Sequence, residues 1–417
     1  MEYGCIGEKL SHSFSKEIHN LLCDYNYILR EVEKSELSAF MTGHNFRAIN
    51  VTIPYKEKVL PYLYSIDSSA EKIGAVNTVV NKDGKLYGYN TDFYGMTSLI
   101  RHAGIDVCGK KVLILGSGGT SKTAMAVCRE LGASKIIRVS RNALEDACSY
   151  EDAYKYHTDA QVIINCTPVG MHPKSENCPV DISKFPKLCG VVDAVYNPLR
   201  TRLVREAKKR GIKSEGGLYM LVFQALRACE LFNEIEIPVQ KGNEVYKTIL
   251  GGKENIVLTG MPGSGKTTIG RIIAQKMGRK FVDTDECIRE KCGCEISEIF
   301  EKCGESAFRD IETEVIARVS KETGVVIATG GGAILRGENV DSLSSNGVLV
   351  FIDAGIDSIC ETSDRPLSNT REKLTALYEV RYPIYRETCD VKVEITRNGE
   401  ENAERVIKEF ERIISER

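Results

Sequence analysis

The chain has 417 residues, of which 42% are hydrophobic and 27% charged, and its 56 basic and 58 acidic side chains leave a net charge of -2. This length predicts two or three domains, and the composition is typical of a globular protein. The balanced charge gives no bulk attraction to nucleic acid or to a membrane surface. No basic segment followed by an apolar stretch opens the chain, and no apolar run approaches the roughly 18 residues of a transmembrane helix.

The 15 cysteines are an odd number and are spread along the whole chain. This distribution favours reduced thiols and a cytoplasmic location over a disulfide scaffold. Cys287, Cys292, Cys294 and Cys303 do cluster, but a zinc site would want C-x-x-C pairs or nearby histidines. We therefore expect ordinary half-buried thiols there.

Residues 1–97 alternate short apolar runs with helical stretches. Strands are predicted at Tyr3–Ile6, Ala48–Ile53 and Ala75–Val80. After a helical segment comes the strand 112–115, then a glycine turn, a helix over Ser121–Leu131, strands at Ile136–Ser140, Val162–Cys166 and Val191–Ala194, and a long helix over Leu218–Phe232. This alternation predicts an α/β fold with a parallel, doubly wound sheet.

A short polar linker is predicted at 251–255, directly before a second α/β domain. The elements expected in that domain are strands at Ile256–Thr259, Lys280–Val282, Val325–Ala328 and Val348–Ile352, a helix from Thr267, helices over 286–320 and a terminal helix over Glu401–Arg412. This order is typical of a P-loop kinase of ordinary domain size.

The second domain carries a nucleotide P-loop, since residues 260–267 read GMPGSGKT and fit G-x-x-x-x-G-K-[ST] at every fixed position. The glycines let backbone N–H groups close around phosphate oxygens, and the helix N-terminus adds partial positive charge. Lys266 is expected to reach the β- and γ-phosphates, and the Thr267 hydroxyl to bind Mg²⁺. The residues predicted to bind ATP here are Gly263, Ser264, Gly265, Lys266, Thr267 and Thr268.

Five short motifs identify the group that accepts the phosphate. In chain order they are Asp283-Thr284-Asp285, GESAFRDIE at 304–312, Gly330-Gly331-Gly332, Asp364-Arg365-Pro366-Leu367 and Arg381-Tyr382-Pro383-Ile384-Tyr385. The ordered set resembles shikimate kinase from about residue 254 to 417.

The resemblance implies a role for each matching residue. Asp283 would help Thr267 to hold Mg²⁺, and Asp285 would bind shikimate hydroxyls and accept a proton. Shikimate binding would further use Arg309 and Arg381 on the carboxylate, where planar guanidinium groups fit well, and backbone N–H groups of Gly331 and Gly332. Glu312 would hold Arg309.

Arg365 lies where the resemblance implies a lid arginine that contacts ATP and stabilises charge on the transferring phosphoryl group. The family usually has a further arginine a few residues earlier, near the adenine. The stretch Ser358–Ser363 has none, which predicts a short lid with fewer contacts to adenine.

The first half carries a dinucleotide-binding turn, Gly116-Ser117-Gly118-Gly119, directly after the apolar strand 112–115. The third glycine of G-x-G-x-x-G is missing, so the turn alone is a weak signal. The next strand ends at Ser140-Arg141 with no acidic residue before Glu145. A basic residue at this position favours the 2′-phosphate of NADP, and Glu145 in place of a second basic residue weakens that preference.

The strongest motifs of the first half surround this turn. They are HSFS at 12–15, NVTIPYK at 50–56, GAVNT at 74–78, Asn90-Thr91-Asp92, NCTPVGM at 165–171 and GGLYM at 216–220 followed by Gln224. The set resembles shikimate dehydrogenase from residue 1 to about 250.

The resemblance implies that the first half reduces a ring ketone, a reaction in which an alkoxide needs a proton donor. Lys56 can supply the proton, and Asp92 would position the ammonium group. The resemblance implies that Ser13, Ser15, Thr52, Lys56, Asn77, Asp92, Tyr196 and Gln224 bind the substrate. For NADP(H) it implies Gly116, Gly118, Gly119, Thr120, Ser140, Arg141, Thr167, Met171 and Gly217.

The two resemblances imply one polypeptide with three domains. Residues 1–97, completed by helices in about 219–250, would bind the dehydrogenase substrate, 98–218 would form a Rossmann-like NADP domain, and 256–417 a P-loop shikimate kinase domain. Shikimate, the product of the first reaction, is the acceptor of the second. The implied enzyme converts 3-dehydroshikimate to shikimate 3-phosphate with NADPH, ATP and Mg²⁺, within chorismate and aromatic amino acid biosynthesis.

Two alternatives stay open on the sequence. The first half could be a quinate/shikimate dehydrogenase that uses NAD, or one half could be a catalytically silent regulatory or binding module. Small-molecule substrates are the expected partners, with no nucleic acid and no membrane. The oligomeric state is undetermined, and a homodimer is one option.

Overall fold

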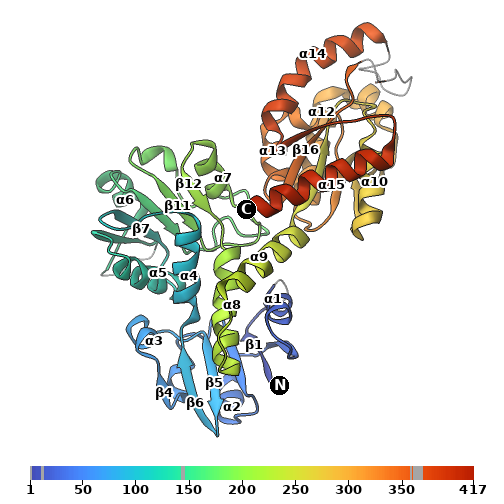
Figure 1. Ribbon diagram of the computed structural model, residues 1–417. Coiled ribbons are helices and arrows are strands. Elements are labelled where there is room, and N and C mark those ends of the chain that lie inside the picture. The colour runs from blue at the N-terminus through green and yellow to red at the C-terminus, as the bar shows by residue number, and fades with distance from the viewer. Residues whose placement is uncertain (1, 11–13, 142–145, 357–358, 360–369) are drawn as a thin grey trace. The chain divides into compact units, whose positions relative to one another are not determined.

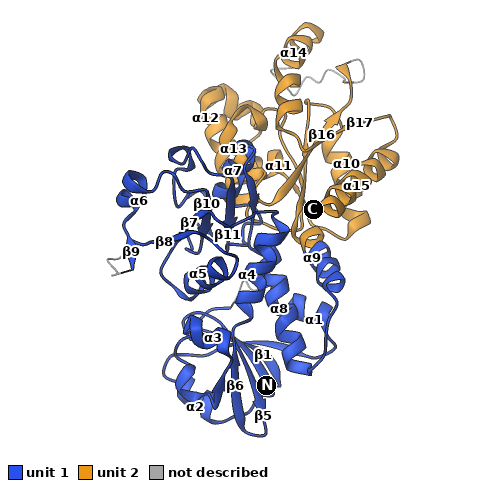
Figure 2. Cartoon of the chain, turned by 60° about the vertical axis from the view of Figure 1, so that its left-hand side comes forward, with its two compact units in different colours: residues 1–249 blue, residues 250–417 orange. Residues whose placement is uncertain are grey.

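A computed structural model describes residues 2–10, 14–141, 146–356, 359 and 370–417 (Figure 1). The chain divides into two compact units, Met1–Ile249 and Leu250–Arg417 (Figure 2). Among the helices in these ranges, none is long and apolar enough to cross a membrane.

The first sheet of unit 1 has the strand order β2-β1-β3-β5-β6-β4. Its strands are β1 (Tyr3–Gly7), β2 (Tyr27–Glu31), β3 (Ala48–Val51), β4 (Ser65–Ile66), β5 (Thr78–Lys82) and β6 (Lys85–Tyr89). Helices α1 (Ser15–Leu22), α2 (Leu37–Thr42) and α3 (Ser68–Ile73) accompany it, with a short 3₁₀ turn η1 (Leu60–Tyr62). A core that includes Ile6, Val51, Tyr55 and Val76 lies against this sheet.

This sheet is mixed, which differs from the purely parallel sheet predicted. Strand β5 runs antiparallel to both β3 and β6. The β5–β6 hairpin turns at Asp83 and Gly84, whose φ angles are 51° and 81°. Positive φ at both central residues is the backbone of a type I′ turn, for which Asp-Gly is a preferred pair. The sequence Asp83-Gly84 is therefore a signal for a β-hairpin at this position.

The second sheet of unit 1 is parallel throughout, with the order β12-β11-β10-β7-β8-β9. Its strands are β7 (Lys111–Leu115), β8 (Lys135–Val139), β9 (Ala147–Cys148), β10 (Val162–Asn165), β11 (Gly190–Asp193) and β12 (Lys213–Glu215), and its helices are α5 (Gly119–Glu130), α6 (Tyr150–Tyr156) and α7 (Arg202–Lys209), with the 3₁₀ turn η2 (Ile182–Lys184). The parallel, doubly wound arrangement predicted here is confirmed.

Two long helices, α4 (Thr91–His102) and α8 (Leu218–Asn233), pack against each other between the two sheets (Figure 1). Gly95 permits the close approach, because a Cβ on it would lie 2.6 Å from the Met220 carbonyl oxygen. Helix α4 begins directly after β6, and α8 begins after β12. Both helices therefore bring side chains to the region where the two sheets meet.

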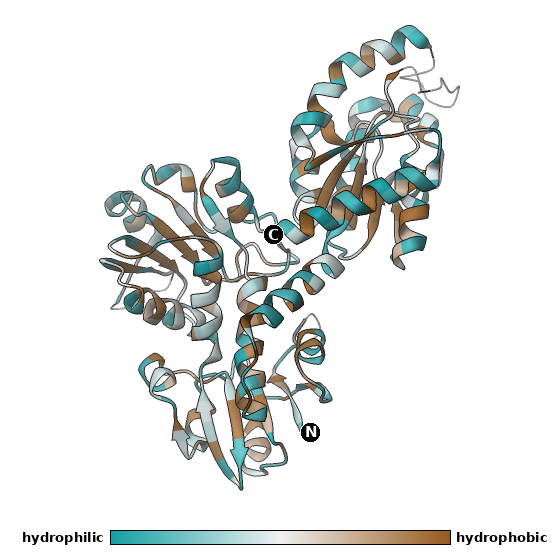
Figure 3. Cartoon of the chain, in the orientation of Figure 1, coloured by the Kyte–Doolittle hydropathy of each residue, from teal (hydrophilic) through white to brown (hydrophobic). Residues whose placement is uncertain are grey.

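Unit 2 is a parallel five-stranded sheet in the order β14-β15-β13-β16-β17. Its strands are β13 (Asn255–Thr259), β14 (Phe281–Asp283), β15 (Val326–Ala328), β16 (Gly347–Asp353) and β17 (Val391–Glu394). Its helices are α10 (Lys266–Met277), α11 (Thr284–Cys292), α12 (Ile296–Val319), α13 (Gly337–Leu343), α14 (Arg371–Thr388) and α15 (Gly399–Glu416), with the 3₁₀ turn η3 (Ala333–Leu335). In Figure 3 the strands of this sheet are largely brown, which marks apolar residues, and α15 has a polar and an apolar face.

The junction differs from the loop-like linker predicted at 251–255. Helix α9 runs over Val239–Lys253, and β13 begins at Asn255, so Glu254 alone separates helix from strand. The guanidinium group of Arg279 donates to the carbonyl oxygens of Gly251 and Glu254 at 2.5 and 2.6 Å. Carbonyls at a helix C-terminus lack intrahelical partners, so this contact offsets the low helix propensity of the glycines.

Glu254 is fully buried, with an exposed fraction of 0%, and pairs with the last residue of the chain. Nη1 of Arg417 lies 2.8 Å from both carboxylate oxygens. Removing one partner of a buried ion pair leaves an uncompensated charge, which is strongly destabilising. The pair therefore ties the end of α15 to the beginning of β13.

We predict that Arg417→Ala lowers the free energy of opening of β13 by about 2 kcal/mol, because Arg417 is partly exposed and some water reaches Glu254. Hydrogen exchange of the amides of residues 256–259 would measure this as a roughly thirtyfold loss of protection. Arg412→Ala is the matched control, since Arg412 is 49% exposed and its pairs with Glu409 and Glu416 lie on the surface. Equal losses in both variants would contradict a role for the buried pair.

Candidate active sites

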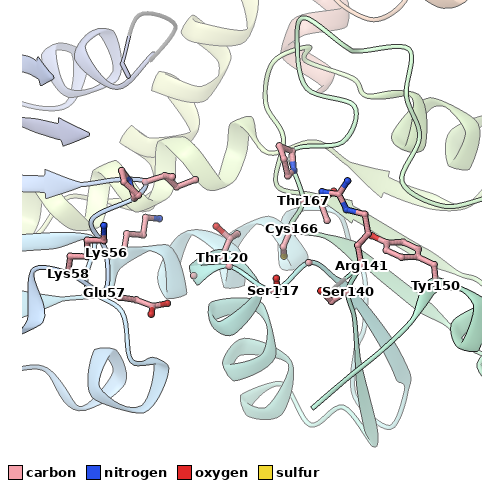
Figure 4. Close-up of a pocket in the computed structure, with 16 residues that line it drawn as sticks. Lys56, Glu57, Lys58, Ser117, Thr120, Ser140, Arg141, Tyr150, Cys166 and Thr167 are labelled. Atoms are coloured by element: carbon pink, nitrogen blue, oxygen red, sulfur yellow. The ribbon is translucent and has the colours of Figure 1, made fainter. Parts of the chain in front are cut away.

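Unit 1 contains a cleft of about 460 Å³ where the glycine turn faces the segment after β3 (Figure 4). Seven of the residues predicted to bind NADP line it, together with Lys56: Gly116, Gly118, Gly119, Thr120, Ser140, Arg141 and Thr167. Met171 and Gly217 do not line it. Met171 is 45% exposed, and Gly217 is the N-cap residue of α8.

The glycine turn requires its glycine at position 116. Its φ is 114°, and a Cβ there would lie 3.1 Å from the carbonyl oxygen of Cys166 at the end of β10. Around Gly118 a Cβ would meet nothing within 4 Å, so that side of the turn is open. Helix α5 begins at Gly119, and a helix N-terminus with free N–H groups suits a phosphate. The turn can hold a pyrophosphate.

Arg141 and Tyr150 lie at the end of the cleft away from Lys56 (Figure 4). Arg141 is exposed, follows β8 and acts on Tyr150 through its charge, although burial dominates and raises the pKa of Tyr150. Sequence reasoning missed Tyr150, because it lies in a helix outside the motifs and only the pairing of β9 with β8 brings that helix here. Asn142 and Glu145 lie outside the described residues.

Lys56 and Asp92 form an ion pair at the other end of the cleft, as predicted. Nζ of Lys56 lies 2.5 Å from Oδ2 of Asp92, and the two side chains are 16% and 9% exposed. Asp92 is fixed in the first turn of α4, where Asn90 accepts a hydrogen bond from Phe93 N at 3.2 Å. The carbonyl of Lys56 accepts from Val76 N at 2.8 Å. The ammonium group is thus positioned by both neighbouring segments.

The amides predicted to bind the substrate meet at Thr91. Oδ1 of Asn77 accepts from Thr91 N at 2.7 Å, and Nδ2 of Asn77 donates to Thr91 Oγ1 at 3.0 Å. The Thr91 hydroxyl also lies 3.5 Å from Oε1 of Gln224 on α8. Thr91, next to Asp92, was inside a motif noted in the sequence but was assigned no role.

The remaining predicted substrate ligands of unit 1 lie on neighbouring segments. Ser15 is the buried first residue of α1, and Thr52 follows β3 half-buried. The ring of Tyr196 lies 5.3 Å from the ring of Phe14, and burial raises the pKa of Tyr196. Ser13 lies outside the described residues.

The P-loop of unit 2 folds around its own lysine. Nζ of Lys266 donates to the carbonyl oxygens of Gly260 and Met261, both at 2.9 Å. Gly263 and Gly265 each have φ of 81°, a left-handed conformation that favours glycine. Lys266 is the first residue of α10, so its helix N-terminus faces the loop. The geometry is that of a phosphate cradle.

Thr267 and Asp283 lie within hydrogen-bond distance of each other, close enough for both to reach one metal ion. Oγ1 of Thr267 donates to Oδ2 of Asp283 at 2.8 Å. The other oxygen, Oδ1, accepts from Asp285 N at 2.9 Å and Glu286 N at 3.3 Å, which caps α11. A hydroxyl and a carboxylate oxygen beside a phosphate loop are the ligand types that Mg²⁺ prefers. Thr268 follows, exposed, on the first turn of α10.

Arg309 is held from two sides on α12. Nη1 lies 2.7 Å from Glu312 Oε2, and Nη2 lies 3.2 Å from Glu305 Oε1. Glu312 is 0% exposed, and its burial raises the pKa of the carboxyl group while Arg309 lowers it. A Cβ on Gly332 would lie 2.2 Å from the guanidinium group, so a side chain there would displace Arg309 from this arrangement. The predicted contact of Glu312 with Arg309 is present.

Asp285 and Arg381 approach the same glycine segment. A Cβ on Gly330 would lie 2.6 Å from Asp285 Oδ1. Nη1 of Arg381 donates to Gly331 O at 3.0 Å, and burial lowers the pKa of Arg381. The hydroxyl of Tyr385 donates to Gly260 O at 2.9 Å and also to Gly331 O. Tyr385 links the P-loop to the glycine segment, a role that its place in a known motif did not reveal.

The lid arginine and the clustered cysteines of unit 2 differ in what the structure describes. Arg365 and all of Ser358–Ser363 except Ile359 lie outside the described residues. Cys287, Cys292 and Cys294 pack against the core of the unit, and Cys303 is exposed. In the described ranges there is no group of three or more His, Cys, Asp or Glu side chains placed to hold a metal ion.

Known proteins resemble each half. The family model for shikimate kinase matches residues 262–412, and that for the shikimate dehydrogenase substrate binding domain matches residues 5–79. A shikimate dehydrogenase (NADP(+)) of Clostridium perfringens is 37% identical over 265 residues, which cover 59% of this chain and 97% of the relative.

Solved structures agree with the assignment of the first half. A chorismate mutase/shikimate 5-dehydrogenase fusion protein from Clostridium acetobutylicum has a TM-score of 0.56 at 36% identity, covering 59% of this chain and 96% of that one. A Thermus thermophilus shikimate 5-dehydrogenase in complex with NADP(H) and shikimate has a TM-score of 0.54 at 28% identity, covering 60% and 99%. The chain is therefore a bifunctional shikimate-pathway enzyme that belongs to the shikimate dehydrogenase family and carries a shikimate kinase domain in the same polypeptide.

Proposed function

We propose that unit 1 reduces 3-dehydroshikimate to shikimate with NADPH, and that unit 2 phosphorylates shikimate to shikimate 3-phosphate with ATP. One observation carries the first step: Lys56, which is paired with Asp92, lines the same cleft as the glycine turn and Arg141. A proton donor, a pyrophosphate turn and a cation suited to a 2′-phosphate share one space. The division of unit 1 into the two domains given above and a cytoplasmic location are part of this proposal, the latter supported by free cysteines throughout the described chain.

Reduction of the ketone leaves negative charge on its oxygen, which a proton must neutralise. NADPH, when bound, supplies the hydride. Lys56 Nζ carries the proton to be donated, and the Asp92 carboxylate at 2.5 Å orients the ammonium group and stabilises its charge until transfer. Asn77 and Gln224, joined through Thr91, bind ring hydroxyls, while Ser13 and Ser15 bind the carboxylate.

In unit 2 the chain positions an alcohol next to a phosphoryl donor. Arg309 and Arg381 bind the shikimate carboxylate, and Asp285 accepts the proton of the attacking hydroxyl. Gly331 and Gly332 offer backbone N–H groups, while Lys266 holds the phosphates and Arg365 meets the developing charge. Thr267 and Asp283 would hold Mg²⁺, which neutralises phosphate charge when bound.

We predict that Lys56→Ala lowers kcat/KM for 3-dehydroshikimate by about a thousandfold, the range of general acid catalysis. Lys56→Arg is the matched variant, because it keeps a cation for Asp92 but its pKa is too high to release a proton. Steady-state kinetics of both variants should show the loss, while phosphorylation of supplied shikimate stays within about twofold, since the kinase residues lie in a separate compact unit. Full reduction activity in Lys56→Arg would refute proton donation by this residue.

We predict that NADPH is preferred to NADH because the Arg141 cation meets the 2′-phosphate. Arg141→Ala should lower kcat/KM for NADPH about ten- to a hundredfold, the value of one charge-assisted contact, and leave that for NADH within about twofold. NADH on the same preparation is the control for damage to the fold. Equal efficiencies of the two cofactors in the parent enzyme would contradict the assignment and favour an NAD-dependent enzyme.

We predict that Arg309→Lys lowers kcat/KM for shikimate about ten- to a hundredfold with little change in the KM for ATP. Lysine keeps the charge but loses the planar fork that meets a carboxylate with two hydrogen bonds. Arg289→Lys, on α11 with a pair to Glu295 at 3.9 Å, is the control. If Arg309→Lys only lowers the melting temperature and leaves shikimate kinetics unchanged, Arg309 supports the helix and not the substrate.

A further inference from the structure

Asp193 is a buried carboxylate to which none of the steps above gives a role. It is the last residue of β11 and its exposed fraction is 0%. Oδ1 accepts from Asn165 Nδ2 at 2.9 Å and from Val195 N at 3.0 Å, and Oδ2 accepts from Thr201 Oγ1 at 2.7 Å. Three neutral donors only partly offset the loss of hydration of a carboxylate. Burial accordingly raises the pKa of Asp193 to about 7.

The Asn165 contact leads from Asp193 to the wall of the cleft. Asn165, at the end of β10, is also 0% exposed, and its Oδ1 accepts from Thr167 N at 3.0 Å and Thr167 Oγ1 at 2.7 Å. An amide can face either way, but an ionised carboxylate only accepts hydrogen bonds. Asp193 at 2.9 Å and the Val169 carbonyl oxygen at 3.3 Å both accept from Nδ2 of Asn165, which leaves Oδ1 for Thr167 at the wall of the cleft.

The Val195 contact leads to the segment that bears Tyr196. Val195 N donates to Asp193, and Val195 O accepts from Gly217 N at 2.9 Å. Gly217 is the N-cap residue of α8, the helix that carries Gln224, and a Cβ there would lie 2.2 Å from the Ala194 carbonyl oxygen. One carboxylate thus connects the ends of two strands and the start of a helix beside the reaction site.

We propose that Asp193 is a positioning residue of the dehydrogenase: through Asn165 it holds Thr167 at the wall of the cofactor cleft, and through Val195 it holds the backbone beside Tyr196. The proposal rests on the proposed function, because it takes the cleft to bind NADPH. The third partner, Thr201, caps α7 by accepting from Val204 N at 3.4 Å and is not among the residues that line the cleft. The three contacts therefore have separable effects.

The experiment measures NADPH kinetics, shikimate phosphorylation and thermal stability of the full-length chain for three variants. Asp193→Ala should raise the KM for NADPH about tenfold, because the Asn165 amide loses its shorter, charged acceptor and keeps only the Val169 carbonyl oxygen at 3.3 Å. Asp193→Asn should restore the KM to within about threefold, since it keeps an acceptor at Oδ1 and can donate to Thr201 Oγ1. Thr201→Val, the matched control, should lower the melting temperature and leave the KM for NADPH unchanged.

A double-mutant cycle tests the relay itself. Asn165→Ala should reproduce the rise in KM, and Asp193→Ala added to it should cost little more, because both changes break one chain of contacts. Should Asp193→Ala not fold, Asn165→Ala and Asp193→Asn still decide the matter. Phosphorylation of shikimate by unit 2 reports on the amount of chain in each sample, and the melting temperature reports on the folding of unit 1.

The outcomes separate this inference from the function on which it rests. A parent enzyme without NADPH-dependent reduction overturns the proposed function. An active parent overturns the role of Asp193 alone if Asp193→Ala or Asn165→Ala leaves the KM unchanged, if Asp193→Asn gives no rescue, or if Thr201→Val raises the KM equally. Strictly additive effects of Asp193→Ala and Asn165→Ala also overturn it.

Discussion

Both halves depend on the same constraint, that backbone must approach a phosphate with no side chain between them. In each half a glycine ends a central strand of a parallel sheet, Gly116 after β7 and Gly260 after β13, with φ of 114° and 147°. A Cβ on Gly260 would collide with Ile352 O at 2.6 Å, and a Cβ on Gly116 would be in tight contact with Cys166 O, directly after β10, at 3.1 Å. Glycine at positions 116 and 260 is therefore favoured by the packing of the sheet as well as by the phosphate. A substitution at either position would disturb the phosphate site and the sheet together.

The polar chemistry of both halves is held by buried contacts rather than by exposed side chains. Lys56 and Asp92 are paired before any substrate arrives, and Arg309 is fixed by Glu312. Holding a charged side chain in place in advance removes much of the ordering entropy from the binding step. It also costs stability, since a buried charge is tolerated only while its partner remains. Both active centres therefore combine precise geometry with sensitivity to loss of a partner.

The sequence predicted the parts of the fold that follow from local rules. Apolar runs predicted the positions of β7, β10 and β13. Motifs of fixed spacing predicted the functional roles of Lys56, Asp92 and the P-loop, because the functional residues lie in short segments. The Asp83-Gly84 pair is a local signal that indicates the antiparallel β5–β6 hairpin, although the sequence prediction did not include this hairpin. The helical junction at 251–253 could not be predicted, because two glycines argue against a helix and only the distant Arg279 offsets them. The positions of Tyr150 and Asp193 beside the cleft could not be predicted for a similar reason, because contacts between strands far apart in the sequence decide their surroundings.

The continuous helix at the junction has a consequence for anyone who wants the halves separately. Proteases cut extended, exposed segments, and residues 250–255 pass from helix to strand with Glu254 alone between them. Limited digestion is therefore a poor route to an isolated kinase, and recombinant truncation must replace it. A truncation starting at Asn255 would discard Glu254 and both carbonyl oxygens that Arg279 contacts, leaving Arg279 and Arg417 without these partners. A functional kinase half should begin upstream of Leu250, so the useful boundary lies inside a helix and not where the glycines suggest a break.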